Sequence, residues 1–133
     1  FNDNHKNFWG HGSNYSEPQI KIPFIIHWPG MKPGIVTYQT SHFDVVPTIM
    51  QSVLGVSNPV ADYSVGHSLW RNIAEPFYVD GSYSTTAVVT NKRIMTLYPG
   101  GFSSTTDSHL NPASDIDSHT LMLATEQMRR YYK

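Results

Sequence analysis

Apolar and polar positions alternate differently in successive parts of the chain. The first nineteen residues are polar and rich in Asn, Gly and Ser, which predicts a loop. Residues 20–28 then read IKIPFIIHW, a β-branched and aromatic run with apolar side chains at period two. This pattern predicts a strand, and Ile25 makes the strand apolar on both faces. Pro23 favours an edge position or a strand start.

A helical pattern follows in residues 44–54. Ser41 and Asp44 have the S-x-x-D spacing of a capping box, and Asp44 itself suits the N-cap. Gly55 suits the position after the helix end. We therefore predict a helix whose apolar face packs against strand 20–28. The residues of that face are Val45, Val46, Ile49, Met50, Val53 and Leu54.

The rest of the chain alternates between β-rich runs and turn signals. Asp80-Gly81 and Asn91-Lys92 separate these runs, which predicts antiparallel strands near 77–80, 83–90 and 93–98. Residues 99–117 are rich in Gly, Ser, Thr and Asp and predict a long loop. A terminal helix over 118–132, with Ser118 as its cap, closes the chain.

The predicted fold class is therefore α/β. Residues 1–75 form a loop–strand–helix segment of an α/β core, with the helix over 44–54. Residues 76–133 form a small antiparallel β subdomain with a C-terminal helix.

Charge and composition exclude several kinds of partner and site. Nine basic and ten acidic residues give a net charge of −1 without any Lys/Arg stripe, so no nucleic-acid binding is expected. The absence of Cys excludes disulfides and thiolate metal sites from this chain. No apolar run reaches the roughly 20 residues of a membrane span.

The densest candidate chemistry lies in the loop over residues 9–16, which begins WGHGSN. His11 stands between two glycines, so a ligand can approach its ring closely. An imidazolium pairs with anionic oxygens and a neutral imidazole binds metal, although a histidine in an exposed turn explains the pattern equally simply. No HExxH or HxH spacing occurs among the seven histidines, and we predict no metal site. The remaining candidates, His27, His42, His67, His109 and His119, are interpreted as structural.

Four motifs in one order resemble the second half of the sulfatase family of the alkaline-phosphatase superfamily. They are GHGSNY, IPFIIHWPG followed by KPG, TSHFDVVPTIMQSVLG and VGHSLW. That family has a G-[K/H]-G-x-x-Y loop, a strand ending in W-P-G, a helix beginning S-x-x-D and a G-x-S-L turn. The remaining residues are similar to the small antiparallel sheet and terminal helix of such domains. The opening FNDN and the GHGSNYS loop resemble the bacterial inner-membrane members.

This resemblance implies that the chain is a C-terminal fragment of a sulfatase-like fold. The family's nucleophile and principal metal ligands would lie upstream, so no catalytic residue, metal ligand or cofactor is expected within residues 1–133. A divalent metal (Zn, Mn, Ca or Mg) is implied for the intact parent. His11 matches the Lys or His that contacts the substrate's anionic oxygens, and Asn14 in the same loop is the second candidate substrate-binding residue. His rather than Lys resembles the branches that act on phospholipid headgroups.

Two functions follow as expectations from the resemblance. The first is a metal-dependent hydrolase or headgroup transferase for phosphate or sulfate esters, in the periplasmic domain of a bacterial inner-membrane protein, with the fragment inactive alone. The second is a non-catalytic domain that binds lipid headgroups or regulates a partner, because a fold does not determine its function. The expected partners are the missing N-terminal half and an anionic ester or lipid headgroup. Exposed Phe24, Ile25 and Ile26 would also make the fragment self-associate.

Overall fold

The computed structural model describes residues 5–9, 12 and 14–130. The chain forms two compact units, one from Phe1–Gly34 together with Phe77–Lys133, the other from Ile35–Pro76. This division differs from the predicted one, because the N-terminal residues group with the sheet and not with residues 35–75. The α/β class is confirmed: helices accompany a four-stranded antiparallel sheet and a C-terminal helix.

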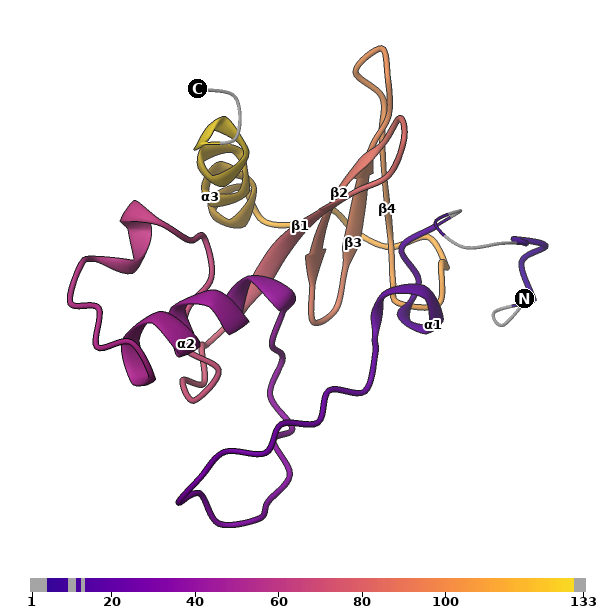
Figure 1. Cartoon of the computed structure of the whole chain (residues 1–133). Helices are drawn as coiled ribbons and strands as arrows, with labels where there is room; N and C mark the ends of the chain where they lie inside the picture. Colours follow the sequence, from indigo (N-terminus) through magenta and orange to yellow (C-terminus); the bar gives the residue numbers. More distant parts are fainter. Residues whose placement is uncertain (1–4, 10–11, 13, 131–133) are drawn as a thin grey trace. The chain divides into compact units, whose positions relative to one another are not determined.

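The sheet of the first unit is a simple antiparallel meander (Figure 1). Its strands are β1 (Phe77–Gly81), β2 (Thr86–Thr90), β3 (Ile94–Leu97) and β4 (Ser103–Thr106), in the spatial order β1-β2-β3-β4. The three predicted strands match β1 to β3. The prediction that residues 99–117 form only a loop is wrong, because β4 lies within it. Its sequence SSTT has no apolar position and therefore gave no periodic signal, yet it pairs along β3 from Leu97 to Ile94.

Apolar residues fill both faces of this sheet. On one face, the core contains Tyr15, Ala87, Val89 and Ile94. On the other face, Val88 packs with Ile116 and with Ala124 of α3 (Ser118–Arg129), which lies against β1. Successive residues of β2 thus point to opposite faces, and both sides of the strand are covered.

The cap of α3 is Asp117 and not Ser118 as predicted. The Asp117 carboxyl accepts hydrogen bonds from Thr120 N at 2.9 Å and from Thr120 Oγ1 at 2.7 Å. Asp117 has the extended backbone of a cap residue, whereas Ser118 already belongs to the helix. The Asp side chain can reach the third helical N–H from there, which explains why the cap lies one residue earlier.

We predict that this cap makes the stability of the protein depend on acid pH. Hydrogen bonds from the Thr120 backbone and side chain hold the pKa of Asp117 below its ordinary value of 3.8. Its stabilising contribution is then complete above the unfolded-state pKa and is lost as the pH falls through the folded-state pKa. Asp117→Asn keeps an acceptor oxygen that does not titrate, so its melting temperature should change less in this acid range than that of the wild type. Thermal unfolding at stepped acid pH measures this, and identical profiles would contradict it.

The second unit contains η1 (His42–Asp44), α2 (Val45–Ser52) and η2 (Val60–Asp62). The predicted helix over 44–54 is confirmed, although it ends two residues earlier. The buried residues of α2 are Pro47 and Thr48, whereas Val46, Ile49, Val53 and Leu54 of the predicted apolar face are exposed. Residues 20–28 belong to the other unit, and the packing of that face against them stays a prediction. Thr48 is buried because its hydroxyl bonds backbone groups, as described below.

Residues 20–28 do not form the predicted strand. Ile20 ends a short helix, α1 (Glu17–Ile20), and residues 21–28 have no regular secondary structure. Glu17 and Pro18 suit a first helical turn, and Lys21 Nζ lies 2.6 Å from the Glu17 carboxyl. A strand also needs a neighbour, and none of the described residues pairs with this segment. Its side chains are exposed, Ile25 at 93%.

Among the residues that the structure describes, no helix is long and apolar enough to cross a membrane.

Candidate functional site

The loop predicted to bind substrate, residues 9–16, is tied to the β1–β2 turn. His11 itself lies outside the described residues. Next to it, the Gly12 carbonyl accepts a hydrogen bond from Ser82 Oγ at 3.1 Å. Ser82 N donates to the Thr85 carbonyl at 2.9 Å and closes the β1–β2 turn. The chain directly after His11 is therefore attached to a hairpin of the sheet.

Tyr15 anchors the other end of the loop in the core. Its side chain is buried among Ala87, Val89 and Ile94. Its hydroxyl donates to the Thr85 carbonyl at 2.9 Å and lies 2.8 Å from Thr85 Oγ1. A buried hydroxyl with two partners holds its ring in one orientation. The tyrosine of the G-x-G-x-x-Y pattern is thus a structural residue, a role that the sequence motif alone did not indicate.

Asn14 shapes the backbone between these two anchors. Its Oδ1 accepts a hydrogen bond from Ser16 N at 2.9 Å, which is an Asx turn leading into α1. Ser16 is buried and Asn14 is partly exposed, so the turn leads from the surface of the unit into its interior. Contact of Asn14 with a substrate stays a prediction.

A small cavity lies between the loop and the β1–β2 turn. It encloses about 130 Å³ and is lined by Asn14, Tyr15 and Asp80 among others. An acidic side chain in the lining does not favour an anion, so this cavity is a poor site for a phosphate or sulfate group. Burial, and to a smaller extent Asp80, raises the pKa of Tyr78, which packs against the Tyr15 cluster, to about 12.

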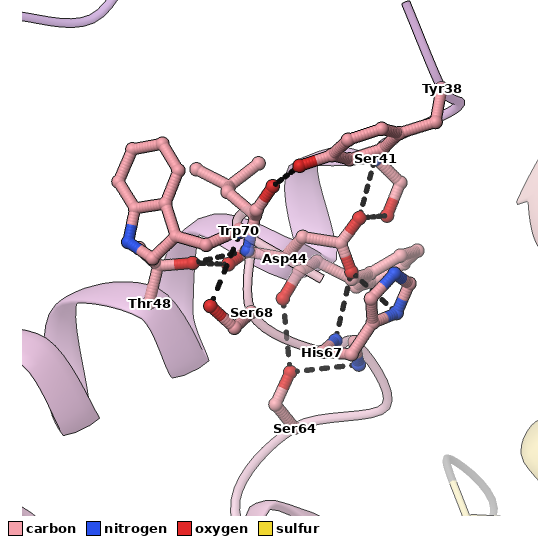
Figure 2. Close-up of polar contacts among 11 residues, drawn as sticks. Tyr38, Ser41, Asp44, Thr48, Ser64, His67, Ser68 and Trp70 are labelled. Carbon is pink, nitrogen blue, oxygen red and sulfur yellow. Dashed lines mark hydrogen bonds and ion pairs between the residues drawn. The ribbon is translucent and has the colours of Figure 1, made fainter. Parts of the chain in front are cut away.

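The second unit contains a polar network centred on Asp44 (Figure 2). Asp44 is 1% exposed, and its carboxyl accepts from Ser41 N at 2.7 Å and from His67 N at 2.9 Å. The His67 ring also approaches it, with Nδ1 3.2 Å from Oδ1. The carboxyl therefore joins the start of the helix to a turn more than twenty residues later in the chain.

Two hydroxyl groups also connect the start of the helix to this later turn. Thr48 Oγ1 donates to the Asp44 carbonyl at 2.6 Å and accepts from Leu69 N at 2.8 Å. Ser64 Oγ donates to the Phe43 carbonyl at 3.1 Å and accepts from Gly66 N at 3.0 Å. Each hydroxyl thus acts as donor and acceptor between the same two segments, which satisfies their buried backbone groups.

Gly66 allows these two segments to approach closely. A Cβ atom at this position would lie 2.2 Å from the Phe43 carbonyl oxygen and 2.8 Å from Asp44 N. Tyr38 fixes the far end of the turn, because its hydroxyl donates to the Leu69 carbonyl at 2.8 Å. Only glycine fits at position 66.

His67 was interpreted as structural, and its contacts with Asp44 agree with that role. Its Nε2 atom and the Tyr63 hydroxyl are buried without a hydrogen-bond partner among the described residues. In the same part of the chain, no three His, Asp or Glu side chains come together as a metal site would require.

Comparison with known proteins finds a family that the N-terminal part of the chain resembles. The sulfatase family model matches residues 2–56. This part of the chain is similar to the sulfatase family. The sulfatase segment includes the whole loop over 9–16 and α2, and the network around Asp44 joins it to the turn over 64–69 beyond the match.

Two Salmonella proteins extend the similarity over most of the chain. The chain is 32% identical over 122 residues to "Inner membrane protein YejM" of Salmonella typhimurium, and equally to that of Salmonella typhi; the match covers 87% of this chain and 20% of each relative. An "Uncharacterized protein" of Haemophilus influenzae is 30% identical over 75 residues, which are 56% of this chain and 13% of that protein. The chain thus spans about a fifth of the length of the two Salmonella relatives.

Proposed function

We propose that the whole protein is a sulfatase-like enzyme that hydrolyses or transfers phosphate or sulfate esters in the periplasm. This chain would supply the loop that contacts the anionic group of the substrate. The observation that carries the proposal is the loop itself: it belongs to the sulfatase match and is attached to the sheet on the C-terminal side of His11. The inner-membrane relatives support the cellular location.

The attachment matters because binding an anion requires a donor in a fixed place. Gly12 is held by Ser82 and Tyr15 by Thr85, so the backbone beside His11 loses little freedom when a ligand binds. An imidazolium would then donate a charge-assisted hydrogen bond to a phosphate or sulfate oxygen. Asn14 would support His11 through its turn and contribute less to the affinity.

The described residues do not fit a metal site, since they bring no group of three metal-binding side chains together. The metal and the nucleophile proposed for the whole protein would come from outside residues 1–133. The part of the reaction proposed for this chain is the binding and orientation of the anion.

The proposal predicts that His11→Ala weakens anion binding and leaves stability unchanged. Loss of one hydrogen bond to a charged group costs about 1.5–3 kcal/mol, or roughly a ten- to hundred-fold loss of affinity. The melting temperature should correspond to a change within about 0.5 kcal/mol, as for an exposed site. Asn14→Ala should weaken binding less than His11→Ala does.

The measurement is titration of inorganic phosphate and sulfate into the whole protein, paired with thermal unfolding. His5→Ala is the matched control, because His5 is an exposed histidine of the same N-terminal segment. Equal affinity in the wild type and in His11→Ala would show that His11 only occupies an exposed turn. A proportionate loss of stability and affinity would give it a structural role.

A further inference from the structure

Two turns of the sheet lie at the same end. In an antiparallel meander, the β1–β2 turn over 82–85 and the β3–β4 turn over 98–102 project from one end of the strands, and the β2–β3 turn over 91–93 projects from the other end. Figure 1 shows the first two together, at the top right of the sheet. We call these two turns the hairpin tips.

Each hairpin tip exposes aromatic side chains. Tyr83 is fully exposed in the first tip, and Phe102 is 74% exposed in the second. Tyr98, in the second tip, is 44% exposed, and its hydroxyl lies 3.2 Å from Ser104 Oγ. Gly100 and Gly101 have φ values of 89° and 86°, which glycine adopts readily, and Tyr98 N donates to the Phe102 carbonyl at 2.8 Å. The second tip is therefore a formed turn that holds Phe102 outwards.

The hairpin tips are also free of charge. Residues 81–86 read GSYSTT and residues 97–106 read LYPGGFSSTT, with no acidic, basic or His residue in either. The turn at the opposite end carries Lys92 and Arg93. One end of the sheet is thus aromatic, rich in hydroxyls and uncharged, whereas the turn at the other end carries two cations.

We propose that the hairpin tips rest on the surface of a phospholipid bilayer, with Tyr83 and Phe102 at the boundary between headgroups and acyl chains. Tyr side chains favour this boundary, because the ring is apolar and the hydroxyl reaches water and headgroups. Seryl and threonyl hydroxyls beside them suit the same polar layer. Relatives matching most of this chain are inner membrane proteins, so a bilayer is the surface available to such a domain. Without cations in the tips, the contact depends on apolar burial and does not require anionic lipid.

The proposed lipid contact also indicates which substrates would lie within reach of His11. Ser82 in the first tip holds Gly12, so the loop containing His11 is attached to the part of the sheet that meets the lipid. Lipid headgroup esters would then be the substrates within reach of His11, a consequence that rests on the proposed function. The lipid contact itself does not rest on it.

The test uses nitroxide labels on the whole protein reconstituted in nanodiscs of phosphatidylcholine. Ser84→Cys places a label in the first tip and Lys92→Cys a matched label in the opposite turn; both side chains are exposed, and this chain has no native Cys. At each position, the collision rate of the nitroxide with oxygen, which concentrates in lipid, is divided by its collision rate with a water-soluble nickel chelate. We expect the oxygen-to-nickel ratio at residue 84 to be several-fold higher than at residue 92, and to stay so in high salt.

Two further results decide the interpretation. Tyr83→Ser combined with Phe102→Ser should lower the ratio at residue 84 towards that at residue 92, while circular dichroism stays unchanged. His11→Ala should leave the ratio unaltered, which separates this contact from the proposed function. Equal ratios at the two positions would overturn the proposal. Protection of residue 84 from both reagents would also overturn it, since the tips would then be covered by protein.

Discussion

Gly66→Ala should destabilise the protein by about 3 kcal/mol, at the upper end of the usual cost of overpacking. The new methyl group would lie 2.2 Å from the Phe43 carbonyl oxygen. That oxygen belongs to the backbone, so a change of rotamer cannot relieve the contact. The backbone there is also held by the Ser64 hydroxyl and by the carboxyl of Asp44. Thermal or urea unfolding of the protein measures the loss.

Gly34→Ala is the matched control for this prediction. Nothing lies within 4 Å of the methyl group that it adds, and the backbone of Gly34 is not in the left-handed region. Its stability should stay within about 0.5 kcal/mol of the wild type. If Gly66→Ala behaved like Gly34→Ala, the close approach of residues 43 and 66 described here would be wrong.

Asp44→Ala should cost about 2–5 kcal/mol, because it removes a buried acceptor shared by two backbone N–H groups. The substitution leaves Ser41 N and His67 N buried without their acceptor. Each unsatisfied N–H costs about 1–3 kcal/mol. The loss should appear as faster amide hydrogen exchange over residues 41–48 and 64–69, because these two segments are joined through the carboxyl.

Two variants make this result specific. Asp44→Asn keeps one acceptor oxygen and should lose less stability than Asp44→Ala. Asp62→Ala removes an exposed carboxyl of the same unit and should stay within about 0.5 kcal/mol of the wild type. A small loss in Asp44→Ala, comparable with that in Asp62→Ala, would contradict the role of the network.

Local sequence signals correctly predicted most of the helices and strands whose conformation depends mainly on their own residues. The β-rich runs of residues 77–97 and the turns between them specify β1, β2 and β3, and the S-x-x-D spacing specifies the start of η1, which leads into α2. β4 was missed because SSTT becomes a strand only by pairing with β3. The strand predicted over 20–28 failed for the corresponding reason: its apolar pattern was correct for a strand, but no described strand lies beside it.

The contacts of the candidate site depended on long-range geometry. Periodicity identified the one-sided apolar pattern of α2, yet the buried side of the helix is set by Thr48, whose hydroxyl bonds Leu69 N. Likewise, Asp44 suited a cap from its spacing, but its bond to His67 N joins residues far apart in the chain. The order of the four motifs was the sequence signal that these segments belong together.

The sheet explains why the loop and the small subdomain occur in one unit. Ser82 and Thr85 belong to a single hairpin and hold the loop at Gly12 and Tyr15 respectively. A change that shifts this hairpin should therefore alter anion binding without touching His11. The loop and the first hairpin tip are therefore joined by hydrogen bonds, and the function proposed for each has its own test.

Turnover by the whole protein tests the central claim most directly. Hydrolysis of an aryl phosphate, an aryl sulfate and the headgroup ester of phospholipid vesicles would be measured with divalent metal supplied. The account predicts that the wild type hydrolyses at least one of these esters, that His11→Ala lowers kcat/KM about ten- to hundred-fold and that His5→Ala does not. Binding of the anion through His11 without hydrolysis or transfer of any ester would contradict the account, and would make the protein a binding or regulatory domain.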